Sequence, residues 1–184
     1  MKAYFIISIL IWIAIALTGC ESVQTYDTPF IEMEQSTMTL GAQREFCKAN
    51  PDDMFCTTPT SIGDSIPTKE YATKIGYTMA RNNLYKSTYE WYYNDTVYEK
   101  LIGDCSNSAL TIVKQMYEDG IDMQYVYLVY RMTSETTAHL FVAVDTEDGI
   151  LHIDAEEGNG LPIEEQINFH LPMTDVSKWI KGNI

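Results

Sequence analysis

Basic residues are scarce in this chain of 184 residues. Only 12 lysines and arginines stand against 26 aspartates and glutamates, which gives a formal net charge of −14 and a pI near 4.4. A chain with so few positive charges offers no basic patch, and this argues against nucleic acid as a partner. The chain also lacks internal repeats and low-complexity tracts. The acidity instead fits a soluble body that is held off an anionic membrane surface.

Long hydrophobic runs are missing outside the N-terminus. There, Lys2 precedes an apolar run from Ala3 to Leu17, which is shorter than the roughly 20 residues that a membrane span needs. This order of charge, apolar run and small residues predicts a secretory signal. An Ala-x-Ala cleavage site is absent, and Leu17-Thr18-Gly19-Cys20 instead resembles the bacterial lipobox, in which the cysteine becomes the lipid-modified first residue. An uncleaved anchor helix is the alternative.

These features divide the chain into three parts. We expect a lipoprotein signal peptide at 1–19, a lipidated tether at 20–40 and one domain at 41–184, which is long enough to bury a core. Two or more acyl chains on Cys20 would anchor the protein stably to a membrane. Glu21, in place of an aspartate, favours the periplasmic face of the outer membrane.

Cysteine is also rare, with four residues in all. Cys47 and Cys56 flank a turn at Asn50-Pro51-Asp52 and are expected to form a structural disulfide. A metal site there is the weaker interpretation, because no second cysteine or histidine pair lies nearby. With Cys20 lipidated, Cys105 is the odd cysteine of an exported protein and therefore a candidate reactive thiol.

Hydrophobic periodicity predicts an α+β fold. We expect a helix from Thr68 to about Tyr85, with Thr68 as its N-cap, and a second helix from Ser106 to Asp119 that stops at Gly120. Three strands should follow, at 124–130, 139–144 and 150–154. A cysteine-bearing helix followed by an antiparallel meander places the Cys at a helix N-terminus packed against an antiparallel sheet. The tail at 156–184 is polar and irregular until Trp179-Ile180.

Cys105 stands where the second helix begins. Backbone N–H groups and the helix dipole favour a thiolate at that position, and the same N–H groups can stabilise an oxyanion. His139 opens a strand and Asp154 ends the next one, so an antiparallel pair can place the base beside its orienting carboxylate. His152 is the second candidate base, and His170 is expected in a surface loop. The competing interpretation is that Cys105 is a buried, inert thiol.

Three segments in this order resemble the bacterial transglutaminase-like cysteine peptidases, which include the periplasmic adhesin-processing proteases of the LapG type. They are Gly103-Asp104-Cys105, Ala138-His139-Leu140-Phe141-Val142 and Leu151-His152-Ile153-Asp154. Phe46-Cys47-Lys48-Ala49-Asn50-Pro51 with Cys56 resembles that family's Cys-x-x-x-Pro…Cys segment, and Trp91 precedes Gly103 as a family tryptophan does. The resemblance implies a papain-like fold with Cys105 as nucleophile, His139 as base and Asp154 as orienting residue. Trp91 also belongs to the aromatic residues between Tyr85 and Tyr98. Such clusters usually form a core or pocket wall, but this one leads directly into Cys105, so Trp91 is a candidate residue of the substrate groove.

The chain departs from the family after the cysteine. The family continues with Glu-Asp-Tyr and uses these acids, with the preceding Asp, to hold calcium, whereas Ser106-Asn107-Ser108 follow here. Asp104 remains as the one acidic candidate ligand, and serine and asparagine are poorer ligands for a hard cation. We therefore expect no required cofactor, and calcium binding through Asp104 stays an open question.

The sequence predicts a lipid-anchored periplasmic cysteine peptidase that hydrolyses amide bonds of an envelope or surface polypeptide, such as an adhesin, with Cys105, His139 and Asp154. One alternative is a non-catalytic binding module of the envelope on the same fold. Another keeps the chemistry but changes the acceptor or substrate: acyl transfer to an amine, or amide cleavage in peptidoglycan.

Overall fold

The computed structural model describes residues 41–57, 63–88, 90–132, 138–155, 158–159 and 168–175. The expected signal peptide, Cys20 and the tether lie outside these residues. Within the described ranges, no helix is long and apolar enough to cross a membrane.

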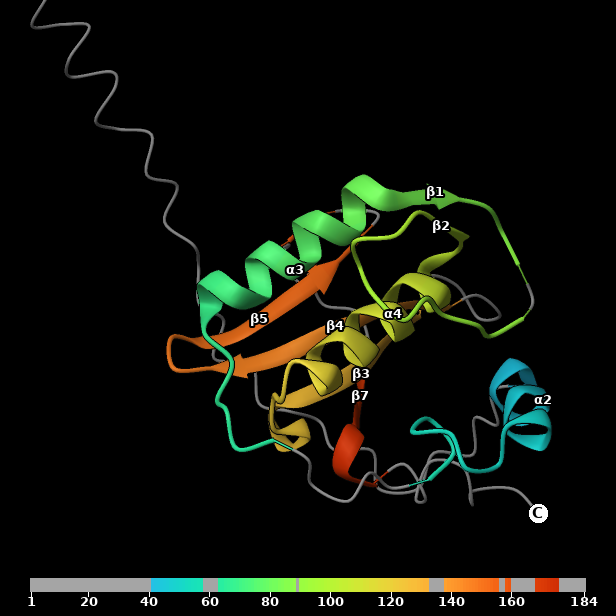
Figure 1. Ribbon diagram of the computed structural model, residues 1–184, viewed down its shortest axis with the longest axis horizontal. Coiled ribbons are helices and arrows are strands. Elements are labelled where there is room, and N and C mark those ends of the chain that lie inside the picture. Colours follow the sequence, from blue (N-terminus) through green and yellow to red (C-terminus); the bar gives the residue numbers. More distant parts are fainter. Residues whose placement is uncertain are drawn as a thin grey trace, which may run out of the picture.

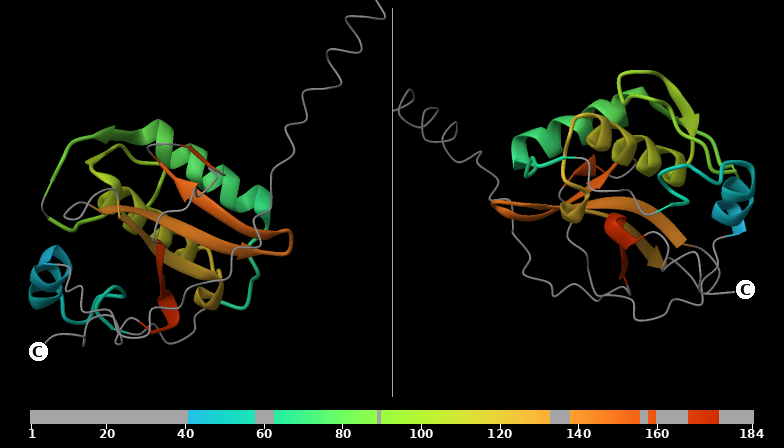
Figure 2. Two further views of the ribbon diagram at one scale, coloured as in Figure 1. Left: turned by 180° about the vertical axis from the view of Figure 1, so that it is seen from behind. Right: turned by 60° about the horizontal axis from the view of Figure 1, so that its bottom comes forward.

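A five-stranded antiparallel sheet forms the centre of the molecule (Figure 1). Its spatial order is β6-β5-β4-β3-β7, and its strands are β3 (Val126–Met132), β4 (Ala138–Thr146), β5 (Gly149–Asp154), β6 (Gly158–Asn159) and β7 (Asn168–Pro172). Helices α3 (Lys69–Asn82) and α4 (Cys105–Glu118) lie together on one face of this sheet, as the views in Figure 2 show. The arrangement confirms the α+β class.

Side chains of β3 and β4 point alternately to the two faces of the sheet, and one set of them forms the core between the sheet and the helices. Val126, Leu128 and Tyr130 of β3 belong to the same buried cluster as alternate residues of β4, starting at Leu140. The intervening residues lie on the opposite face, where Val129 and Phe141 form a second buried cluster. Antiparallel register brings the two strands together, with Tyr130 opposite Leu140. β-branched and aromatic side chains suit such a surface because they pack well on a pleated sheet.

Helix α4 is the most deeply buried helix and begins one residue before the predicted start. Asp104 is its N-cap, and Leu110, Ile112 and Val113 have at most 1% of their surface exposed. The chain turns after the helix at Gly120, whose φ of +77° suits glycine because it has no Cβ to clash.

Helix α3 begins as predicted, with Thr68 as N-cap accepting from the Tyr71 N–H, but it ends at Asn82. Residues Asn83–Tyr85 form strand β1, so the prediction of a helix to about Tyr85 was too long. β1 pairs in parallel with β2 (Leu101–Gly103), which leads directly into α4. This two-stranded sheet was not predicted.

The Cys47–Cys56 disulfide is present. Cys47 lies in the last turn of an unpredicted helix, α2 (Gly41–Ala49), and the expected turn follows at Pro51. β7 corrects a second expectation: His170 does not lie in a loop, because its backbone pairs with Val129 of β3. The tail at 156–184 is therefore not irregular throughout.

Candidate functional site

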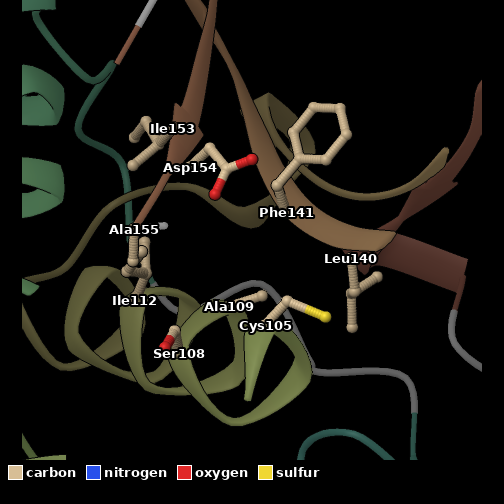
Figure 3. Close-up of a pocket in the computed structure, with 9 residues that line it drawn as sticks. All are labelled: Cys105, Ser108, Ala109, Ile112, Leu140, Phe141, Ile153, Asp154 and Ala155. Carbon is tan, nitrogen blue, oxygen red and sulfur yellow. The ribbon is translucent and has the colours of Figure 1, made fainter. Parts of the chain in front are cut away.

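Cys105 is the first residue of α4 and is partly buried where the helix meets the sheet. Its sulfur turns toward Leu140 of β4 (Figure 3). A narrow pocket lies beside it between α4, β4 and the end of β5, lined by Cys105, Ser108, Ala109, Ile112, Leu140, Phe141, Ile153, Asp154 and Ala155. The free thiol therefore stands at the junction of helix and sheet.

His139 and Asp154 meet across β4 and β5. The Nε2 atom of His139 lies 2.5 Å from Oδ2 of Asp154, and both residues are buried, with 9% and 5% of their surface exposed. Val142 pairs with Ile153, so the two side chains approach each other diagonally across the ladder. Cys105 lies close enough to His139 that a hydrogen bond to it, together with its negative charge, helps to raise the pKa of the imidazole.

Several ionisable groups lie close together around the His139–Asp154 contact. Burial lowers the pKa of His139, but hydrogen bonds to Asp154 and Cys105 and the negative charges of both groups outweigh it and raise this pKa to about 10. Burial, followed by the negative charge of Cys105, raises the pKa of Tyr130 well above its usual value. The site therefore favours a protonated imidazole at neutral pH, in contact with two groups that carry negative charge when ionised.

Hydrogen bonds hold the helix start on which Cys105 lies. Asp104 Oδ1 accepts from the backbone N–H and the hydroxyl of Ser106, at 3.0 and 2.7 Å. Asp104 Oδ2 accepts from the backbone N–H and the hydroxyl of Thr88, both at 3.0 Å. Asn107 completes a capping box, because its Oδ1 accepts from the Asp104 N–H at 3.0 Å. The residues before and after Cys105 are thus fixed.

These contacts do not suit the calcium ion that the resemblance raises. Calcium prefers six to eight oxygen ligands that include carboxylates, whereas Asp104 brings one carboxylate to which four donors are already directed. In the described ranges, no three His, Cys, Asp or Glu side chains lie together in a way that could hold a metal ion. The donor set at Asp104 therefore serves helix capping.

The other candidate residues lie elsewhere. Trp91 has 7% of its surface exposed and packs against Phe46, and it does not line the pocket beside Cys105. Its role in a substrate groove stays a prediction. His152 is buried on β5 and pairs with Ala143, four residues along β4 from His139. Only the backbone of His170 is described, in β7.

Sequence reasoning missed Thr88, Asn107 and Tyr130. Asn107 had a local signal, since an amide side chain three residues after an Asp N-cap follows the capping-box pattern. Thr88 and Tyr130 had none, because tertiary contacts bring Thr88 to Asp104 and Asn107, and Tyr130 to Cys105, from distant positions in the sequence. Comparisons of the chain with protein-family models, curated proteins and solved structures found no match in any of the three.

Proposed function

We propose that the protein is a cysteine peptidase or amidase with a papain-like, transglutaminase-like fold that works through a covalent thioester. The observation that carries the proposal is the position of His139, which contacts Asp154 through Nε2 and the thiol of Cys105 at the start of a helix. A nucleophile, a base and a group that orients the base are the three parts that such catalysis requires.

Each residue has a defined step. The Cys105 sulfur attacks the amide carbonyl carbon, a C–S bond forms, and the carbonyl electron pair moves to oxygen. His139 then gives its proton to the amide nitrogen as the C–N bond breaks and the amine leaves. Water then attacks the thioester carbon while His139 takes its proton, and the C–S bond breaks, which releases the acid and restores the thiolate beside protonated His139. Asp154 keeps the imidazole in the required orientation throughout.

Fewer backbone N–H groups can stabilise the oxyanion than the sequence suggested, because helix capping uses some of them. The Ser106 N–H is directed to the Asp104 carboxylate, and Asn107 shares the same capping box. The Cys105 N–H, the first of the helix and adjacent to the thiol, is the donor that we assign to the oxyanion. One such donor typically contributes about 2.7–4 kcal/mol to the transition state.

The proposed setting follows from the N-terminal sequence. A lipid on Cys20 would tether the domain at the periplasmic face of the outer membrane, where an envelope or surface polypeptide, such as an adhesin, is the substrate class. Mass spectrometry of the membrane-extracted protein tests this setting. It should show Cys20 as the first residue, carrying two or three acyl chains.

Turnover tests the mechanism. Purified domain would be incubated with envelope polypeptides, and new N-termini would be counted by mass spectrometry. Cys105→Ala and His139→Gln should abolish the new termini, while His152→Gln, a matched buried histidine on the next strand, should leave them. New termini that persist in Cys105→Ala would refute the proposal.

A further inference from the structure

Thr88 makes four contacts with three polar groups beside the start of α4. Its backbone N–H donates to Asp104 Oδ2 at 3.0 Å. Its hydroxyl lies 3.0 Å from that same oxygen, 2.9 Å from Asn107 Oδ1 and 3.3 Å from the carbonyl oxygen of Glu90. One residue from outside the helix therefore contacts both the N-cap and the first turn of α4.

Asn107 extends this contact into the core. It is fully buried, and its Nδ2 donates to the carbonyl oxygens of Glu90 and Tyr92, both at 3.0 Å. Its Oδ1 accepts from the Asp104 N–H and lies 2.9 Å from the Thr88 hydroxyl, whose one proton it shares with Asp104 Oδ2. A buried polar network with its members satisfied makes the local structure rigid. The segment around Thr88 and the helix start are thus locked together.

Cys105 is placed by this network although it takes no part in it. It lies between Asp104, which accepts from Thr88, and Ser106, which donates twice to Asp104. Small displacements of a reacting atom cost rate steeply, because attack requires the reacting atoms to be aligned. N–H donors already reach Asp104 Oδ1, Asp104 Oδ2 and Asn107 Oδ1, so these oxygens have hydrogen-bond partners without a cation.

We propose that Thr88 is a positioning residue for Cys105, and that its hydroxyl holds the start of α4 in the orientation facing His139 by hydrogen bonds alone, without a cation. The inference rests on the proposed function, because it assigns Thr88 a role in the reactivity of the same thiol. It adds a residue that neither the motif nor the fold class indicates.

The test compares three variants by the rate of iodoacetamide alkylation at Cys105 and by the urea midpoint of unfolding. Thr88→Val removes the hydroxyl at nearly constant shape, and Thr88→Ser retains it. Thr96→Val is the matched control, because the Thr96 hydroxyl donates to Gln115 Oε1 at 2.6 Å near the other end of α4. We expect alkylation to slow about tenfold in Thr88→Val, from the loss of a hydrogen bond to a charged group, and to stay at the wild-type rate in the other two.

A second experiment tests the effect of calcium on the wild-type protein. Neither calcium chloride nor EGTA should change the alkylation rate or the unfolding midpoint of the wild-type protein, so this experiment holds even where Thr88→Val is too unstable to purify. Equal rates in Thr88→Val and Thr96→Val, or a calcium-dependent rate in the wild type, would overturn the inference. Failure of the proposed function would give a different result. The thiol of the wild-type protein would be alkylated slowly, and the wild-type protein would produce no new N-termini.

Discussion

Replacing Asp154 by Asn should weaken the fold in a pH-dependent manner. The Asp154 carboxylate lies 2.5 Å from His139 Nε2, and both residues are buried. A hydrogen bond to a charged group contributes about 1.5–3 kcal/mol, and asparagine leaves only a neutral acceptor. We therefore expect a coupling free energy of about 2 kcal/mol between the two side chains, isolated by a double-mutant cycle with His139→Gln.

The sign of the pH dependence follows from His139. Its pKa is raised from 6.5 to about 10 in the folded protein, so its contribution to stability is fully present below 6.5 and is lost as pH rises through about 10. Urea unfolding of the four proteins of the cycle at several pH values measures this. The coupling free energy between Asp154 and His139 should be largest at about pH 6 and should decrease toward about pH 10. A coupling that is the same at every pH would refute the reasoning.

Three further variants test the packing and the disulfide of the domain, each by urea unfolding. Gly103→Ala should cost about 1–3 kcal/mol, because the new Cβ would meet the Asn107 Cβ at 2.6 Å and Asn107 is held on several sides; an unchanged midpoint would contradict this close approach. Replacing Cys47 and Cys56 together by Ala should cost about 2.5–3 kcal/mol in the chain-entropy model, and a loss that persists under reducing conditions, where the wild type has no bridge, would argue for a different cause. Leu110→Ala, at a fully buried position of α4, should cost about 2–5 kcal/mol; a loss below that range would mean that the core closes around the cavity.

Local patterns in the sequence were enough to predict the main elements of the site. The apolar face of α4 and the β-branched runs of β3, β4 and β5 are long, strongly periodic segments, so their types were predicted and their ends differed by only a few residues. The position of His139 beside Asp154 followed from the order of two adjacent strands. The catalytic roles assigned to them stay a prediction.

Pairing between distant segments could not be predicted in this way. β1 and β2 have three residues each, too few for a period, and they pair although residues 86–100 separate them in sequence. β7 is short, ends at Pro172 and pairs with β3 only because the tail returns to the sheet. Thr88 reaches Asp104 for the same reason. These features depend on tertiary contacts, which alternation and capping signals along the chain do not encode.

The pH dependence of iodoacetamide alkylation at Cys105 tests the central claim most directly, measured in the wild type and in His139→Gln. A thiol paired with protonated His139 should alkylate rapidly well below the free-thiol range near about 8.5 and should lose that reactivity in His139→Gln. Alkylation that rises only near that range, and equally in both proteins, would contradict an activated nucleophile at the start of α4.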